Sequence, residues 1–227
     1  QRFMLEVARE SLDDAGEAGS KGSSIGVYVG SFANGWYDIM SRDPLHRSQG
    51  FMCSALTHKP NNSMTIRAAC SSALVGLNEA CMAIAKVYCE SAIVGGTNLI
   101  LAPDLVTRLA DQGIISPNGS CKIFSVEVNG YARGEAIVSV FIKSLSAAIC
   151  DGNPIRSIIS GTAANFDGKT SPLTSPSAAT QETLIRRAYK IAGISNISKT
   201  ALFECHGTGT ATGDPIETEA IAAVFGD

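Results

Sequence analysis

The sequence predicts an α/β fold with a largely parallel sheet, and two observations lead to this prediction. Short apolar runs typical of buried strands alternate along the chain with longer segments of helical periodicity. Hydrophobic residues make up 45% of the 227 residues and charged residues 17%, with a mean hydropathy of +0.14. This composition is typical of a globular chain that buries a sizeable core, and it excludes a disordered protein.

Helices are expected at five places. The first runs between Leu5 and Ala15, whose apolar residues share one face, and ends before Gly16. Residues 71–88 are apolar on nearly every side, which predicts a buried helix. The others are a short helix near 105–112, an amphipathic helix over 178–192 and a last helix from about Pro215.

Strands are expected at the apolar runs between these helices. They cover residues 25–31, 63–69, 91–101, 135–143, 155–165 and 200–207. Residues 32–62 contain Pro44, Pro60 and the pair Asn61-Asn62, and we expect them to form an irregular loop. The clearest boundary in the chain is the turn Asp151–Pro154.

Charge and hydropathy exclude several kinds of partner. The net charge is −3 and the pI about 5.6, so no basic surface favours a nucleic acid or an anionic membrane. No apolar run approaches the roughly 20 residues that span a bilayer, and the first residues lack the anatomy of a signal peptide. We therefore expect no nucleic acid and no membrane among the partners.

Cysteine and histidine usage indicates reduced thiols and no metal. The seven cysteines are odd in number and include no C-x-x-C pair, which favours an intracellular, cytoplasmic setting. They are Cys53, Cys70, Cys81, Cys89, Cys121, Cys150 and Cys205. The three histidines, His46, His58 and His206, do not pair with cysteines at zinc-finger spacing. No metal site is expected.

One cysteine, Cys70 in "TIRAACSSAL", lies where a predicted strand meets a predicted helix. A thiolate at a helix N-terminus is stabilised by the helix dipole and by unpaired backbone N–H groups. The same amides can hold the oxyanion that forms when sulfur attacks a thioester. Local sequence also fits a small buried cysteine that fills a tight corner, so both interpretations stay open at this point.

A second candidate site is "ECHGTGTATGDPIETEA", residues 204–220. His206 ends a predicted strand, and the glycines that follow could let backbone approach a ligand closely. Taken alone, Asp214 and Glu217 are most simply a helix cap and a carboxylate matched to the helix dipole, with Pro215 at the first helical position. The Gly-Thr-Gly-Thr run suggests a phosphate cradle but lacks the lysine of a P-loop and the Rossmann spacing.

The two motifs together, with "SAIVGGTNLILAPDL" and "ISPNGSCKIFSVEVNGYARGEA", resemble the β-ketoacyl synthase (ketosynthase) domain of polyketide synthases. The resemblance runs in order over nearly the whole chain and is greatest to the fungal type I reducing synthases. It implies the thiolase-like fold, layered α-β-α-β-α. It further implies that residues 1–153 form most of the N-terminal half with the nucleophile, and residues 154–227 the start of the C-terminal half.

The resemblance implies a decarboxylative Claisen condensation, an acyltransferase reaction of secondary metabolism and of fatty acid biosynthesis. Cys70 matches the family's nucleophile, which takes an acyl chain from a carrier-protein thioester. His206 matches the first of two catalytic histidines, which stabilise the enolate formed when a malonyl-type extender loses CO2. Asp214 and Glu217, with Thr208 and Thr210, match positions that support the histidines. Glu135 matches a structural acidic position.

The resemblance also implies partners. The substrates are acyl and malonyl thioesters on the phosphopantetheine of an acyl carrier protein, so no cofactor is expected in this chain itself. A homodimer is expected in the full-length protein.

Three departures from the family pattern lead us to expect a partial domain that does not complete condensation by itself. The family's second histidine, its lysine and its Gly-Phe-Gly loop have no counterpart here, and neither does an N-terminal strand. Residues 50–64 are shorter than in relatives, and Arg67-Ala68 replaces Asp-Thr. Two other functions compete with the ketosynthase interpretation. A coenzyme A-dependent thiolase or chalcone synthase relative would lack "GDPIE", and a non-catalytic scaffold typically loses the cysteine.

Overall fold

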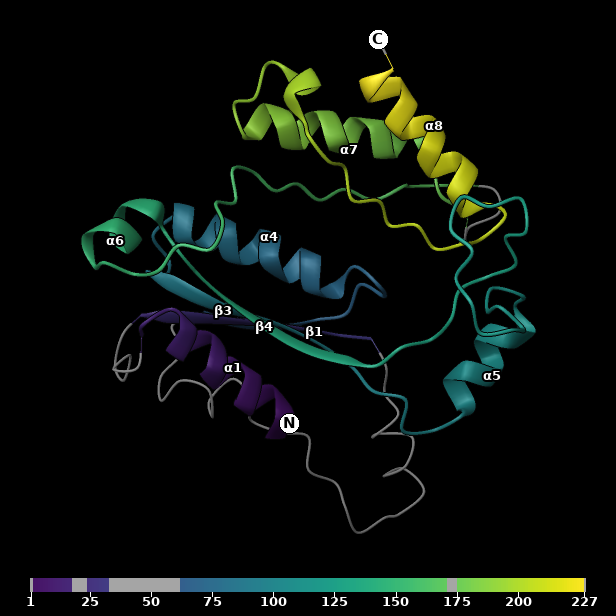
Figure 1. The fold of residues 1–227 in the computed structure, drawn as a ribbon. Helices are drawn as coiled ribbons and strands as arrows, with labels where there is room; N and C mark the ends of the chain where they lie inside the picture. Colours follow the sequence, from purple (N-terminus) through teal and green to yellow (C-terminus); the bar gives the residue numbers. More distant parts are fainter. Residues whose placement is uncertain (1, 18–23, 33–61, 171–174, 227) are drawn as a thin grey trace. The chain divides into compact units, whose positions relative to one another are not determined.

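The computed structural model describes residues 2–17, 24–32, 62–170 and 175–226. These residues form two compact units. Figure 1 labels helices and strands of the chain. Unit 1 comprises Gln1–Ala102 and Gly134–Ile158, and unit 2 comprises Pro103–Arg133 and Ile159–Asp227. Most of the loop predicted over residues 32–62 lies outside the described residues.

Unit 1 is built on a four-stranded sheet of order β2-β1-β3-β4. The strands are β1 (Ile25–Ser31), β2 (Asn62–Ile66), β3 (Ser91–Asn98) and β4 (Ala136–Lys143). β1 pairs in parallel with both β2 and β3, whereas β4 is antiparallel to β3. The predicted α/β class with a largely parallel sheet is confirmed.

Helix α1 (Arg2–Asp14) covers one face of this sheet and α4 (Ser72–Ala85) covers the other (Figure 1). On the α1 face, Met4, Ala8 and Leu12 form a buried stripe with a spacing of four residues. They pack against Ile25 of β1 and Ile93 of β3. As predicted, the helix ends before Gly16, which adopts a left-handed φ of 74°.

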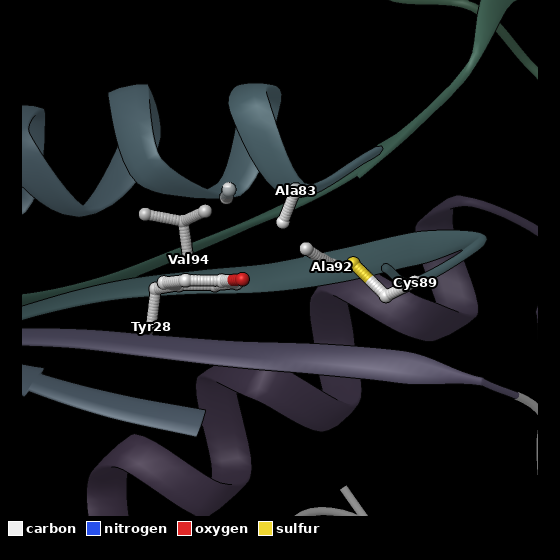
Figure 2. Close-up of a cluster of buried hydrophobic side chains, with 6 residues drawn as sticks. Tyr28, Ala83, Cys89, Ala92 and Val94 are labelled. Carbon is white, nitrogen blue, oxygen red and sulfur yellow. The ribbon is translucent and has the colours of Figure 1, made fainter. Parts of the chain in front are cut away.

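The α4 face has a second core, drawn in Figure 2, in which Tyr28 lies beneath the helix. The core residues are Tyr28, Ala80, Ala83, Cys89, Ala92 and Val94. The Tyr28 hydroxyl accepts a hydrogen bond from Asn62 Nδ2 at 2.8 Å. Burial, together with the nearby Cys89 and Glu79, raises the pKa of Tyr28 to about 12. The phenol therefore stays neutral inside the core.

Two adjacent glycines of β3 let one helix approach each face of the sheet. A Cβ on Gly95 would lie 2.1 Å from Met4 Cε of α1, and a Cβ on Gly96 would lie 3.0 Å from Ala73 Cβ of α4. Successive residues of a strand point to opposite faces, so the pair opens space on both sides at the same level. Side chains here would push both helices outward.

Helix α4 is not buried all round, and that prediction is wrong. The face that packs on the sheet carries the small residues Gly76, Ala80 and Ala83. Of the larger apolar stripe, Leu74 is 70% exposed. The physical reason is the close approach of α4 to the sheet, because only a stripe of small residues fits at that distance.

Unit 2 contains α5 (Asp104–Asp111), α7 (Ala178–Ile191), the short 3₁₀ helix η1 (Ile197–Lys199) and α8 (Gly213–Phe225). Helices α7 and α8 pack together, and Figure 1 shows them as neighbours. Tyr189 and Phe203 both make edge-to-face contacts with Phe225, at centroid distances of 5.9 and 5.4 Å. The predicted helices near 105–112 and over 178–192 are confirmed within one or two residues.

Two predicted strands, 155–165 and 200–207, are not strands in this structure. Both are described throughout, and neither pairs with a strand of the described chain. An apolar, β-branched run favours an extended backbone, but a strand also needs a neighbour to share its ladder hydrogen bonds. The local pattern is therefore not sufficient to predict a strand, because it does not contain the pairing partner.

Candidate functional site

Cys70 lies in a tight turn of unit 1 that joins β2 to α4. The strand ends at Ile66 rather than at residue 69, as the sequence had suggested. The residue before the thiol, Ala69, has a φ of 50°, a left-handed conformation that is uncommon for a residue with a Cβ. Cys70 itself is exposed. The turn therefore holds the thiol out of the core, which argues against a corner-filling cysteine.

Two serine hydroxyls close this turn. Ser71 Oγ donates to the carbonyl of Ala68 at 2.8 Å. Ser72 Oγ donates to the carbonyl of Ala69 at 2.7 Å and accepts from Ala68 N at 2.8 Å. These bonds fix residues 68–72 as one piece with the start of α4.

The N-terminus of α4 is not capped by a side chain. Ser71 occupies the N-cap position, but its hydroxyl makes no capping hydrogen bond because it is turned back to the Ala68 carbonyl. The first turn of a helix carries N–H groups without intrahelical partners. The structure thus combines an exposed thiol with a helix N-terminus that has no side-chain cap.

Other cysteines are placed less favourably for reaction. Burial raises the pKa of the Cys89 thiol, and burial together with the charges of Glu217 and Glu204 raises that of Cys205. Cys121 Sγ accepts a hydrogen bond from Ala132 N at 3.1 Å. Cys150 is exposed, and Cys53 lies outside the described residues.

The segment that carries His206 belongs to unit 2 and is held by Glu217 of α8. Glu217 Oε1 accepts from His206 N at 2.6 Å, and Oε2 accepts from Gly207 N at 2.8 Å. Gly207 has a φ of 52°, a left-handed backbone conformation that glycine adopts readily. The carboxylate fixes the backbone from which the imidazole extends.

Asp214, 4% exposed, holds the same loop at a second point. Its Oδ1 accepts from Gly209 N at 2.9 Å and its Oδ2 from Phe124 N at 2.8 Å. The expectation that Asp214 is a helix cap with Pro215 at the first helical position is wrong. The helix begins at Gly213 after Thr212, so Pro215 is its third residue and the Asp214 carboxylate serves other segments.

The two threonines of the motif contact each other. Thr208 and Thr210 place their hydroxyls 3.0 Å apart, and Thr210 Oγ1 accepts from Gly213 N at 3.0 Å. The amides of Gly207 and Gly209 are bound by Glu217 and Asp214. Because the chain's own carboxylates use these donors, the loop is not a phosphate cradle.

Residues 123–130, part of the quoted motif "ISPNGSCKIFSVEVNGYARGEA", support the His206 loop, a role that the sequence did not assign to them. Phe124 has a φ of 56°, an outlier for a bulky residue, and its N–H is the one that Asp214 binds. A Cβ on Gly207 would lie 2.9 Å from Ile123 Cγ2, and Gly130 N donates to Gly209 O at 2.8 Å. The contacts of this segment to the loop are made by backbone and aliphatic groups, so no residue type marked it as part of a site.

The structure brings five of the predicted site residues together in unit 2. They are His206, Thr208, Thr210, Asp214 and Glu217. Cys70 belongs to unit 1, and its meeting with His206 at one substrate stays a prediction. Glu135 has the expected structural place, since its Oε1 accepts from Ile100 N at 2.6 Å.

The described part of the chain shows neither a candidate metal site nor a membrane-spanning helix. No group of three or more His, Cys, Asp and Glu side chains there could hold a metal ion. Within those same ranges, no helix is long and apolar enough to cross a membrane.

Comparison with known families gives two matches. Residues 1–148 match the β-ketoacyl synthase N-terminal domain, and residues 156–227 match the β-ketoacyl synthase C-terminal domain. The chain is 51% identical over 238 residues to a highly reducing polyketide synthase of Aspergillus fumigatus and 49% identical over 240 residues to one of Penicillium soppii. Both alignments cover 100% of this chain and 10% of the relative.

Solved structures agree. The ketosynthase from module 6 of the bacillaene synthase of Bacillus subtilis superposes with a TM-score of 0.89 at 34% identity, over 99% of this chain and 41% of that one. A Streptomyces albus oxazolomycin ketosynthase domain gives a TM-score of 0.88 at 29% identity, over 99% of this chain and 40% of that one. The fold is thus the thiolase-like one of ketosynthases. The chain spans about two-fifths of these domains and a tenth of the two fungal relatives.

Proposed function

The chain belongs to the β-ketoacyl synthase family, and we propose that it supplies the nucleophile and the first catalytic histidine for a decarboxylative condensation in polyketide synthesis. The observation that carries the proposal is the turn at Cys70. It places an exposed thiol immediately before an uncapped helix N-terminus, with Ala69 at a φ of 50°.

In the first step Cys70 is acylated. Its thiolate attacks the carbonyl carbon of an acyl thioester on a carrier protein, and the new C–S bond forms through a tetrahedral oxyanion. We propose that amides of the first turn of α4 hold this oxyanion, since this helix end has no side-chain cap. The bond to the phosphopantetheine sulfur then breaks, and the carrier leaves as a thiol that takes up the proton given up by Cys70.

In the second step a malonyl-type extender on a carrier protein loses CO2. The electrons of the broken C–C bond remain as an enolate, whose oxygen is the former thioester oxygen. His206 donates a hydrogen bond to that oxygen, and its backbone is held by Glu217 at 2.6 Å. The enolate carbon attacks the Cys70 thioester, a C–C bond forms, and Cys70 leaves as a thiolate.

These steps are acyl transfer, so the chain's enzyme class is acyltransferase. The partners are an acyl carrier protein, which brings the phosphopantetheine arm, and the acyl and malonyl thioesters that it carries. A homodimer, a cytoplasmic location and a boundary between the two halves near residues 153 and 154 are further parts of the proposal. They rest on the family resemblance.

The test follows acylation and decarboxylation separately in the full-length protein. With acyl-carrier protein alone, mass spectrometry should find the acyl group on Cys70, and Cys70→Ala should abolish it. Cys150→Ala is the matched control, because Cys150 is also an exposed thiol but is the last residue of the six-residue helix α6 (Leu145–Cys150) rather than a residue at a helix N-terminus. His206→Ala should keep acylation and slow CO2 release by about 10²–10³. An acyl adduct that persists in Cys70→Ala would overturn the proposal.

A further inference from the structure

One face of β1 alternates glycine with tyrosine beneath α4. Gly26, Tyr28 and Gly30 point to the same side of the sheet, because side chains alternate along a strand. Tyr28 fills the space under the middle of the helix, in the core with Ala80 and Ala83. Both glycines are crowded, and they are crowded by different parts of the molecule.

Gly30 meets the backbone at the first turn of α4. A Cβ at this position would lie 2.5 Å from Ala73 N, 2.6 Å from Ser72 C and 2.8 Å from Ala73 Cα. These are main-chain atoms of a helix, which no rotamer change can move aside. An ordinary contact begins at 3.4 Å, so a side chain here would displace the helix end from β1 by about 1 Å.

Any such displacement reaches the thiol. α4 begins at Ser72, two residues after Cys70. The turn is bound to the helix start by Ser72 Oγ, which contacts Ala68 N and the Ala69 carbonyl at 2.8 and 2.7 Å. The thiol and the helix amides therefore move away from β1 as one body, or the strained turn at Ala69 deforms.

A second glycine, on the neighbouring strand β3, also limits the position of the N-terminus of α4. A Cβ on Gly96 of β3 would lie 3.0 Å from Ala73 Cβ and 3.4 Å from Val138 Cγ2. These neighbours are side-chain atoms, and the contact is looser than that at Gly30. Ala73 is thus bounded by a glycine on each of two adjacent strands.

From this geometry we infer that Gly30, assisted by Gly96, is a positioning residue for acyl transfer to Cys70. The two glycines set how deeply the N-terminus of α4 sits on the sheet, and so where the sulfur and the amides meet the thioester. The inference rests on the proposed function, since it concerns the acylation of Cys70.

The matched control is Gly26, on the same strand and the same face. A Cβ there would lie 2.9 Å from Tyr28 Cε2 and 3.1 Å from Cys89 Sγ, at the far end of α4 from Cys70. Gly26→Ala therefore disturbs the same core without touching the helix start. A general loss of stability should follow either substitution, whereas a change in the position of Cys70 should follow only Gly30→Ala.

The experiment measures two reactions of Cys70 in the full-length protein at saturating substrate. Acyl transfer from an acyl-carrier thioester needs the amides aligned with the sulfur, whereas alkylation by iodoacetamide forms no oxyanion at a carbonyl. Because a misplacement of about 1 Å can cost about 10²-fold in rate, acyl transfer in Gly30→Ala should fall about 10- to 100-fold. Alkylation of Cys70 should change little, and Gly26→Ala should keep wild-type acyl transfer.

A size exchange gives an independent arm that holds even if Gly30→Ala does not fold. Gly96→Ala should slow acyl transfer less than Gly30→Ala, because its nearest neighbour is a methyl group. Ala73→Gly removes that methyl group, so the double variant Gly96→Ala, Ala73→Gly should regain acyl transfer relative to Gly96→Ala alone.

The outcomes distinguish a failure of the proposed function from a failure of the positioning role. Absence of acylation at Cys70 in the wild-type protein would refute the proposed function. Normal wild-type acylation with equal acyl-transfer rates in Gly30→Ala and Gly26→Ala, or a Gly96→Ala defect that Ala73→Gly does not relieve, would refute the positioning role alone.

Discussion

Glu217 binds the main chain of His206, with 2.6 Å between the carboxylate Oε1 and the histidine nitrogen. The other carboxylate oxygen binds the next amide, that of Gly207, at 2.8 Å. Both bonds are charge-assisted, and both hold backbone rather than the imidazole. The ring is thereby oriented through its own main chain and stays available to a substrate oxygen.

Glu217→Gln should slow decarboxylation while the protein remains folded, with a moderate loss of unfolding free energy. The amide side chain can accept from one N–H, but its NH2 group then faces the other donor, and the loss should be about 1–3 kcal/mol in unfolding free energy. CO2 release and urea unfolding are the two measurements. Glu219→Gln is the control, an exposed carboxylate on the same helix. If Glu217→Gln released CO2 at the wild-type rate, the orienting role would be wrong.

Cys70 should be the first thiol to react with limiting iodoacetamide or cerulenin. It alone combines exposure with an uncapped helix N-terminus in the described chain. Cys89 and Cys205 should react slowly at neutral pH, since their raised pKa values leave little thiolate. Peptide mapping over time identifies the order of labelling. Adducts on Cys121 or Cys150 ahead of Cys70 would contradict this.

Lys143→Met should destabilise unit 1 by roughly 1–2 kcal/mol, between the values for surface and buried ion pairs. Lys143 Nζ lies 2.6 Å from Glu17 Oε1 and 3.1 Å from Asn153 Oδ1, forms an ion pair with Asp151, and its side chain is 14% exposed. Burial alone would lower the pKa of Lys143, but its bonds to Asp151 and Glu17 outweigh burial and raise it.

The control for Lys143 is an ion pair on the surface. Arg2 and Glu6 form an exposed pair in α1 at 3.1 Å, so Arg2→Met should change the unfolding free energy by less than about 0.5 kcal/mol. Urea denaturation of both variants gives the comparison. Equal effects would show that the Lys143 cluster stabilises no more than a surface pair.

Stability should fall steeply as the pH rises from about 10 to 12, and Tyr28 should account for part of the fall. The folded pKa of Tyr28 is about 12 against an ordinary 10, so in this window the unfolded chain loses a proton that the folded chain keeps. Two pKa units correspond to about 3 kcal/mol. Tyr28→Phe should flatten the curve of unfolding free energy against pH in this window, and an unchanged slope would contradict it.

Local patterns predicted those elements whose signals are themselves local. β1 (Ile25–Ser31) has the predicted bounds. Its apolar run, which is buried on both faces of the sheet, ends at glycine and serine, so the signal for this strand lies within the run itself. The periodicity of residues 178–192 predicted α7 for the same reason. Residues 155–165 failed as a strand, because pairing depends on a second segment that the pattern does not contain.

In the candidate site too, the sequence predicted features with a local signal and missed those that depend on distant segments or on backbone conformation. The sequence identified Cys70, His206 and Glu217 as chemically meaningful, but it could not show that Ala69 adopts a positive φ, since alanine carries no signal for it. It also interpreted Asp214 as a cap. One partner of that carboxylate, the N–H of Phe124, lies 90 residues away, and a backbone amide has no sequence signature.

The two oxygens of Asp214 have partners at very different separations along the chain, five residues for Gly209 and 90 for Phe124. The short loop closes at small entropic cost, whereas the long one requires the intervening chain to be ordered first. The bend at Cys70 is closed by bonds spanning three or four residues. During folding, we therefore expect the bend at Cys70 to form early and the support of the His206 loop to be completed late. A refolding population can hold a formed thiol turn before it holds a competent oxyanion donor.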